Sequence, residues 1–146
     1  MGNYKKYFKY KELNEKLSNA LKNEFYYEAI FIEFAILEDR TSSMLRHAKY
    51  HQDTYEKCLN DKLNLISSSP KFDNEYVKKH ITQDMIKQIH NWKNKRNKLI
   101  HNLAETEYSN EFIKNTAIEG NNLIKKVSSK STLVNDYFDK HIKSLL

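Results

Sequence analysis

The sequence predicts an all-α protein, an up-down bundle of four to six helices in one domain spanning residues 1–146. Apolar residues recur at helical spacing along most of the chain. Only two Gly and one Pro are present, too few for the many tight turns of a β-sandwich or barrel. Ten Tyr and seven Phe supplement the Leu and Ile of the core, since each buried aromatic side chain removes about 150–250 Å² from water.

Three helices are expected in the first half of the chain. The first covers residues 7–22, where Leu13, Leu17 and Leu21 repeat at intervals of four. The second covers residues 24–51 and carries two apolar stripes, which is typical of a central helix with neighbours on two sides. A shorter helix is expected over residues 55–66, ended by the loop signal Ser-Ser-Ser-Pro at residues 67–70.

Two longer helical regions are expected in the second half. Thr82 is a suitable N-cap for a helix that continues to about Ala104. A last region begins near Ser109, and its serine-rich stretch at residues 128–132 is expected to interrupt it. An amphipathic pattern resumes after that stretch and continues to Leu145.

Composition restricts the classes of function. The net charge of +6, from 25 basic and 19 acidic residues, favours polyanionic partners. Cys58 is the only cysteine, which excludes an intramolecular disulfide and disfavours a cysteine-based zinc site. No GxSxG, P-loop or Rossmann motif is present. No apolar run of membrane-spanning length occurs, so a cytoplasmic protein without a membrane partner is expected.

His47 and His51 have the i, i+4 spacing of a helical metal site, with Asp53 and Cys58 nearby in the sequence. A metal-dependent helical enzyme is therefore one alternative. Two exposed histidines at a helix end are the simpler interpretation, and no metal or cofactor is expected.

Arg96 interrupts an apolar stripe. Its stripe advances in steps of 4, 3, 4, 3 and 4 through the following residues: Met85, Ile89, Trp92, Arg96, Leu99 and Leu103. A buried guanidinium requires a carboxylate, a subunit interface or an anionic ligand. The alternative is an arginine whose stem packs while its head reaches water.

Asp39, with Glu38 beside it, continues an apolar stripe of the second helix and is the expected carboxylate partner of Arg96. Such a pair would orient the guanidinium, and a purely structural ion pair is an equal alternative. His101 follows Asn97 by four residues and shares its helix face. Arg96 and His101 lie about 140° apart around an ideal helix.

The segment Lys-Arg-Asn-Lys-Leu-Ile-His-Asn at residues 95–102 resembles the signature of HEPN (higher eukaryotes and prokaryotes nucleotide-binding) domains. That signature is an arginine, usually followed by a polar residue, and a histidine four to six positions later. Arg96, Asn97 and His101 match it with a four-residue gap. The resemblance implies a helical bundle, often homodimeric. Many members are metal-independent ribonucleases of toxin–antitoxin, abortive-infection or other antiviral defence systems.

The resemblance also implies roles for these residues. His101 would transfer a proton near neutral pH, and Arg96 would stabilise charge on the reacting phosphate. Asn97 would support the site by hydrogen-bonding the phosphate or by orienting His101. The RNA 2′-OH would attack its neighbouring phosphate, leaving a 2′,3′-cyclic phosphate. Because one chain offers a single such histidine, a homodimer with a composite site is expected.

Lys93, Lys95 and Lys98 surround the motif and are candidate RNA contacts, with a solvated helix face as the alternative. Trp92 is interpreted as a core residue. The tyrosine that follows the histidine by two positions in the nucleotidylated branch of the family is Leu103 here, although Tyr108 is nearby. An antitoxin or regulatory protein is a further expected partner. The alternative function is a non-catalytic helical dimerisation or RNA-binding module in which Arg96 is structural.

Overall fold

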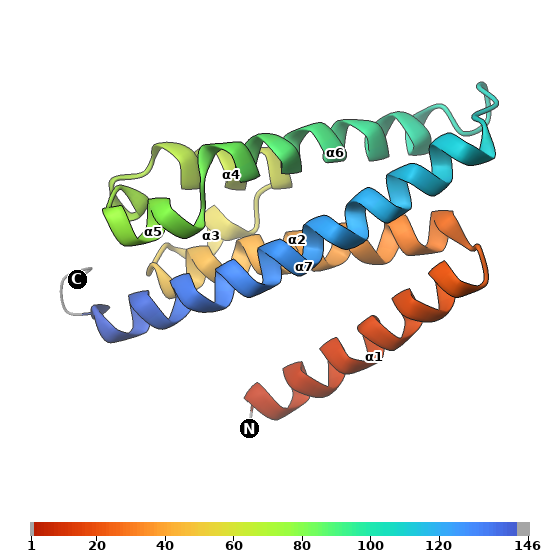
Figure 1. Cartoon of the computed structure of the whole chain (residues 1–146). Coiled ribbons are helices and arrows are strands. Elements are labelled where there is room, and N and C mark those ends of the chain that lie inside the picture. Colours follow the sequence, from red (N-terminus) through yellow and green to blue (C-terminus); the bar gives the residue numbers. More distant parts are fainter. Residues whose placement is uncertain (1, 143–146) are drawn as a thin grey trace.

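The computed structural model describes residues 2–142, with side chains described from Tyr4 onward. The described residues form seven α-helices, one 3-10 turn and no strand, which confirms the predicted all-α class. The four long helices are α1 (Gly2–Lys22), α2 (Tyr26–His47), α6 (Gln83–His101) and α7 (Asn110–Lys140). The short elements are α3 (Gln52–Tyr55), α4 (Leu59–Ser68), the 3-10 turn η1 (Pro70–Phe72) and α5 (Glu75–His80). The long helices alternate in direction along the chain (Figure 1).

The centre of the bundle is the pair α2 and α7, which pack along each other (Figure 1). Helix α1 packs on α2, whereas α6 packs on α7 and on α4. Trp92, Leu37 and Phe138, from three different long helices, are fully buried in the shared core. The two apolar stripes expected for the second helix thus correspond to neighbours on more than one side of α2.

Local capping determines where α6 and α7 begin. The Thr82 hydroxyl accepts a hydrogen bond from the Met85 N–H at 3.1 Å, and the Ser109 hydroxyl accepts one from the Phe112 N–H at 3.1 Å. Each hydroxyl satisfies a backbone donor that has no partner inside its helix. The predicted start at Thr82 and the start near Ser109 are confirmed. Helix α6 ends at His101, before the predicted Ala104.

Several predicted boundaries in the first half are wrong. Helix α1 begins at Gly2, α2 ends at His47, and α3 and α4 replace the single helix expected over residues 55–66. After α2, Lys49 has a φ of 63°, and the Tyr50 N–H donates to the Leu45 carbonyl at 3.1 Å. This closure is the one that a glycine usually provides, so a sequence without a glycine there gives no signal of it.

The serine-rich stretch at residues 128–132 does not interrupt α7, which is continuous from Asn110 to Lys140. The hydroxyls of Ser131 and Thr132 donate to the Ser128 carbonyl at 3.1 and 3.0 Å. The hydroxyls therefore bond inside the helix instead of competing with it as caps, and the burial of Ser131 keeps that turn in the core. Leu145, the expected end of the last amphipathic pattern, lies outside the described residues.

Candidate functional site

Arg96 is partly buried on α6 and lies against an aromatic ring. Its Cζ is 3.9 Å from the centroid of the Phe34 ring on α2, and its Nη1 donates to the Asn97 Oδ1 at 3.0 Å. Its Nε is buried, and no described residue accepts a hydrogen bond from it. Burial lowers the pKa of Arg96, and the negative charge of Glu38 partly offsets that effect. The guanidinium is thus held by a cation–π contact and a neighbouring amide, and it retains an unpaired donor.

The expected partnership of Arg96 with Asp39 is wrong, because Asp39 faces α1. The Asp39 carboxylate accepts a hydrogen bond from the Tyr10 hydroxyl and lies 3.2 Å from the Lys6 ammonium. Burial raises the pKa of Asp39, but the Tyr10 hydrogen bond and the positive charges of Lys6 and Arg46 outweigh it, so the pKa lies below its usual value. Asp39 therefore joins α1 to α2, and Glu38 is the acidic residue whose charge reaches Arg96.

His101 is the last residue of α6, and its side chain is exposed. Within the described part of the chain it makes no hydrogen bond, whereas Asn97 is bonded to Arg96. Since α6 remains helical through His101, the imidazole and the guanidinium keep the separation of about 140° around the helix. A single chain therefore presents the two groups on different sides of α6.

Tyr108 closes the end of α6. Its hydroxyl donates to the Lys98 carbonyl at 3.2 Å and accepts from the Asn102 amide at 3.4 Å, and its ring stacks on Phe112. These bonds satisfy polar groups at the helix terminus. Tyr108 thus stabilises the backbone that carries His101.

Two of the three lysines expected to contact RNA have partners within the protein. Lys93 is buried, with its Nζ donating to the Asn60 Oδ1 at 2.8 Å. Lys95 forms an ion pair with Glu119 at 2.7 Å. Lys98 is exposed. Lys93 is not positioned to contact RNA as expected, because that position of α6 faces α4 and the side chain is buried there. Of the three lysines, Lys98 alone is in the exposed class.

The structure does not have the i, i+4 helical spacing that the alternative metal site at His47 and His51 requires. Helix α2 ends at His47, and His51 precedes α3, so the two histidines do not share a helix. His47 Nδ1 lies 2.6 Å from the Asp139 Oδ1 on α7. Across residues 2–142 no group of three or more His, Cys, Asp or Glu side chains is placed to hold a metal ion.

Sequence reasoning missed Glu33. This side chain is fully buried on α2, and neither carboxyl oxygen has a hydrogen-bond partner among the described residues. Burial raises its pKa to about 9. The carboxyl lies against Trp92 and Gly120, so closely that a methyl group in place of the Gly120 hydrogen would overlap the Glu33 Oε1. The available signals were a Glu between Ile30 and Leu37 on an apolar stripe, and a glycine inside a predicted helix.

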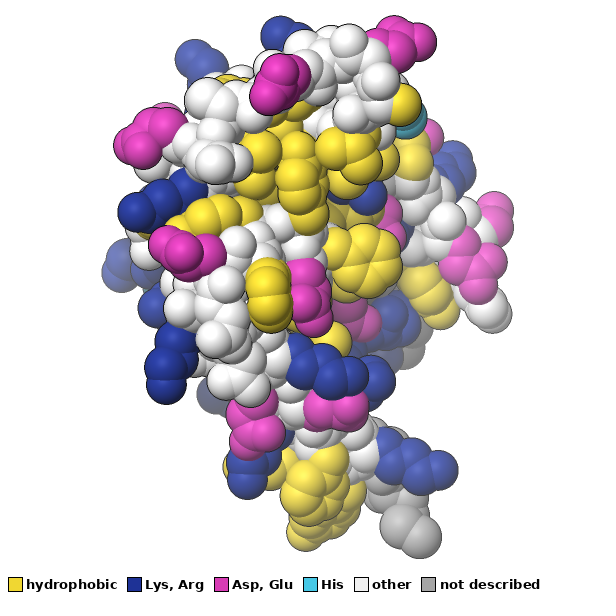
Figure 2. Space-filling view, turned by 90° about the vertical axis from the view of Figure 1, so that its right-hand side faces the viewer, with side chains coloured by type: hydrophobic (Ala, Val, Ile, Leu, Met, Phe, Trp, Pro, Cys, Tyr) yellow, Lys and Arg dark blue, Asp and Glu magenta, His cyan; other side chains and the backbone are white. Residues whose placement is uncertain are grey.

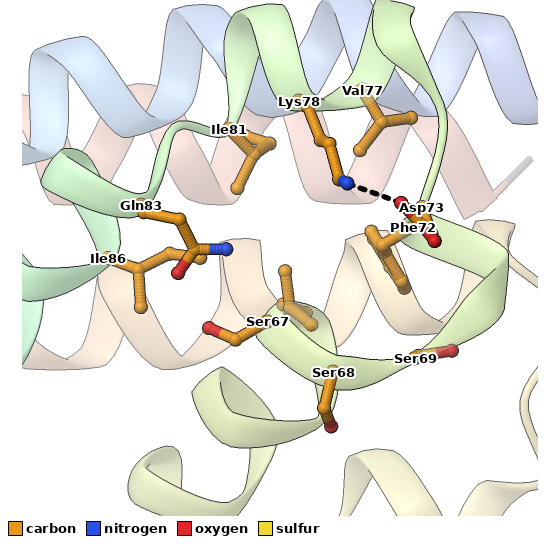
Figure 3. Close-up of a pocket in the computed structure, with 11 residues that line it drawn as sticks. Ser67, Ser68, Ser69, Phe72, Asp73, Val77, Lys78, Ile81, Gln83 and Ile86 are labelled. Atoms are coloured by element: carbon orange, nitrogen blue, oxygen red, sulfur yellow. Dashed lines mark ion pairs between the residues drawn. The ribbon is translucent and has the colours of Figure 1, made fainter.

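A cavity lies elsewhere, between α4, η1, α5 and the start of α6 (Figure 3). Three consecutive serines, residues 67–69, and the aliphatic side chains of Val77 and Ile86 line it. Lys78 at its edge is ion-paired with Asp73. Neither Arg96 nor His101 lines this cavity, so the motif on α6 lies apart from it.

No family model, curated protein or solved structure matches the chain. Along residues 2–142, no helix is both long enough and apolar enough to cross a membrane.

Proposed function

We propose that the protein is a metal-independent endoribonuclease of the HEPN type, acting as a toxin or an antiviral defence effector. One observation carries the proposal: the partly buried guanidinium of Arg96, which forms no ion pair among the described residues, and the exposed imidazole of His101 occupy the last turns of one helix in an all-α bundle. This combination fits an anionic substrate that undergoes proton transfer.

In the proposed reaction the ribose 2′-oxygen forms a bond to the adjacent phosphorus, and the bond from phosphorus to the 5′-oxygen breaks. One imidazole accepts the 2′-OH proton, and an imidazolium donates a proton to the departing 5′-oxygen. The products are a 2′,3′-cyclic phosphate and a 5′-OH end. Arg96 stabilises the negative charge on the phosphorane oxygens, and its hydrogen bond to Asn97 orients the guanidinium.

A homodimer supplies the second imidazole. The angular separation of Arg96 and His101 leaves a single chain with an incomplete site, whereas a two-fold axis beside α6 brings two copies of both residues into one cleft. Ile100 and Leu103, next to the motif, are 39% and 53% exposed and offer an apolar contact. Figure 2 faces this end of the molecule, where hydrophobic side chains gather at the surface.

The test is cleavage of total RNA and tRNA by the purified protein in EDTA. The wild type is expected to produce 2′,3′-cyclic ends, and His101→Ala is expected to lose about 100-fold or more of the rate, the usual contribution of a general acid or base. His51→Ala is the matched control, because it removes another exposed histidine outside the motif. Equal cleavage by wild type and a folded His101→Ala protein would contradict the proposal, as would cleavage that EDTA abolishes.

The alternative is a non-catalytic dimerisation or RNA-binding module, and the packing of Arg96 on Phe34 favours it. Arg96→Met separates the two because it retains an apolar stem over the ring and removes the charge. A catalytic arginine predicts lost cleavage with a nearly unchanged Tm. If the arginine is only structural, the wild type is expected not to cleave RNA. In that case Arg96→Ala, which also removes the stem over the ring, is expected to lower the Tm.

A further inference from the structure

The outer face of the first half of α1 consists of aromatic rings and lysines. Residues 4–11 read Tyr-Lys-Lys-Tyr-Phe-Lys-Tyr-Lys, without a residue of any other kind. Tyr4, Tyr7 and Phe8 are 72%, 65% and 61% exposed. Large apolar rings exposed together on a surface usually mark an interaction site.

The fold determines which side of this segment is free. Tyr10 and Lys6 face α2, where both contact Asp39 and the Arg40 guanidinium lies 4.2 Å from the centroid of the Tyr10 ring. At about 100° per residue, Tyr4, Tyr7, Phe8 and Lys11 fall within an arc of about 100° that excludes Lys6 and Tyr10. These contacts hold the outer face in a fixed orientation, while Figure 1 shows the start of α1 diverging from the other long helices.

The segment is also strongly basic. It contains four lysines and no acidic residue. Among the residues that the structure describes, Lys6 is the one lysine of this segment that is ion-paired to another helix, with Asp39. The next acidic residue, Glu12, is already bound by Lys9 and Lys16 at 3.6 and 3.1 Å. In Figure 2, hydrophobic side chains project from the lower end of the molecule, where α1 begins, with lysine or arginine side chains beside them. The face is therefore complementary to a polyanion that also offers apolar surfaces.

The arrangement favours a nucleic acid strand over a membrane. A helix that lies on a membrane separates its apolar and charged faces. Here Lys11 lies within the arc formed by Tyr7, Tyr4 and Phe8, and no Leu, Ile, Val or Trp occurs in residues 4–11. Lys11 lies among the rings, and Lys5 and Lys9 lie about 60° and 100° beyond Phe8 around the helix. Ammonium groups inside and beside a set of aromatic rings suit a single strand, because every base can stack on an aromatic ring and each phosphate can contact a lysine.

We propose that this face of α1 binds single-stranded nucleic acid, with bases stacking on Tyr4, Tyr7 and Phe8 and phosphates contacting Lys5, Lys9 and Lys11. The face is separate from the candidate catalytic residues, since α1 packs on α2 whereas α6 packs on α7 and α4. Binding at α1 does not require cleavage at α6.

The test measures fluorescence anisotropy of a labelled 20-nucleotide oligouridylate and of the matching oligodeoxythymidylate with the full chain. Both probes are titrated with a His101→Ala protein, so that cleavage does not affect the measurement. Tyr7→Ala/Phe8→Ala is expected to weaken binding by about 10- to 100-fold, in line with the usual contribution of stacked bases. Phe31→Ala is the control, because Phe31 is equally exposed, at 67%, but lies on α2.

The salt dependence tests the lysines. Replacing Lys5, Lys9 and Lys11 together by Gln is expected to reduce the slope of log affinity against log salt by about 2, because each phosphate contact on a single strand contributes about 0.7. Replacing the exposed Lys57, Lys87 and Lys125 by Gln is expected to leave the slope nearly unchanged.

Three outcomes overturn the proposal: the starting protein binds neither oligonucleotide, Tyr7→Ala/Phe8→Ala binds them with unchanged affinity, or the protein binds a duplex as tightly as a single strand. Sedimentation with vesicles of phosphatidylcholine and phosphatidylserine, without oligonucleotide binding, would assign the face to an anionic membrane. Self-association abolished by Tyr7→Ala/Phe8→Ala would assign it to a second copy. Binding at α1 without any cleavage by the wild type would contradict only the proposed ribonuclease activity.

Discussion

Glu33 is the residue whose burial most affects how stability depends on pH. Its carboxyl lies in the core against Trp92 and Gly120, and no group within residues 4–142 forms a hydrogen bond with it. A charge at that position would be very costly, so the folded protein keeps the carboxyl protonated near neutral pH. Gly120 is required in the interior of α7 because even a methyl group would meet the carboxyl and the Trp92 ring.

The prediction for Glu33 concerns the free energy of unfolding between about pH 5 and about pH 8. The pKa of Glu33 is about 9 in the folded protein, against an ordinary value of 4.5. Between these values the folded state binds more protons than the unfolded state, so the stabilisation present at low pH is lost as the pH rises toward 9. The wild type is expected to lose up to about 4 kcal/mol of its free energy of unfolding between about pH 5 and about pH 8, and Glu33→Gln is expected not to show this loss.

Thermal or urea unfolding at a series of pH values measures this effect. Glu28→Gln provides the control, since Glu28 is an exposed residue of the same helix. The amide of Glu33→Gln also lacks partners, so the comparison uses the slope with pH and not the stability at one pH. If the free energy of unfolding varies with pH in the same way in the wild type and in Glu33→Gln, the prediction is wrong, and Glu33 is already charged in the folded protein near neutral pH.

Helices α1 and α2 both end without the glycine that commonly closes a helix. Glu24, after α1, and Lys49, after α2, both have φ values of 63°. The Phe25 N–H donates to the Ala20 carbonyl at 2.8 Å, in the same pattern as Tyr50 and Leu45. A side chain in this left-handed region costs about 1 kcal/mol or more relative to glycine. These closures persist because Ala20 and Leu45 are buried and hold the turns in place.

Glu24→Gly is therefore expected to stabilise the protein, by about 0.5–1 kcal/mol, although glycine usually destabilises a helical protein. Urea unfolding measures the change. Glu15→Gly is the matched comparison, because Glu15 is an exposed position inside α1 and the substitution there is expected to cost about 1 kcal/mol. Destabilisation by both substitutions would mean that Glu24 is not held at positive φ.

The central pair α2 and α7 separates two outer surfaces of the bundle. Helix α1 covers one side, with its aromatic and basic outer face, and α6 with the short helices covers another (Figure 1). The proposed reaction requires two copies of the chain beside α6. The apolar Ile100 and Leu103 are the expected contacts, because burying them together with the motif removes apolar surface from water.

Wild-type protein is expected to sediment as a dimer, and Ile100→Glu/Leu103→Glu to shift it to a monomer with at least about 100-fold less cleavage, the loss expected when one catalytic imidazole is absent. Ile118→Glu on α7, where Ile118 is 43% exposed, is the control and is expected to remain dimeric. A wild-type monomer that cleaves RNA would contradict the composite site.

Much of the fold follows from local patterns in the sequence. The all-α class, the starts of α6 and α7 and the burial of Trp92 were predictable, because helical periodicity and the hydroxyl caps Thr82 and Ser109 act within a few residues of the chain. The position of Arg96 on an apolar stripe was predictable for the same reason, and the structure places it partly buried.

Only the tertiary structure decided what the polar side chains contact. Asp39 binds Tyr10 on α1, Lys93 binds Asn60 on α4, and Glu33 is buried without a hydrogen-bond partner in the described part of the chain. It also decided that α7 continues through its serines, because Ser131 is buried in the bundle core. The physical reason is that periodicity specifies which residues share a helix face, whereas the partner of each face depends on helices that lie far apart along the chain.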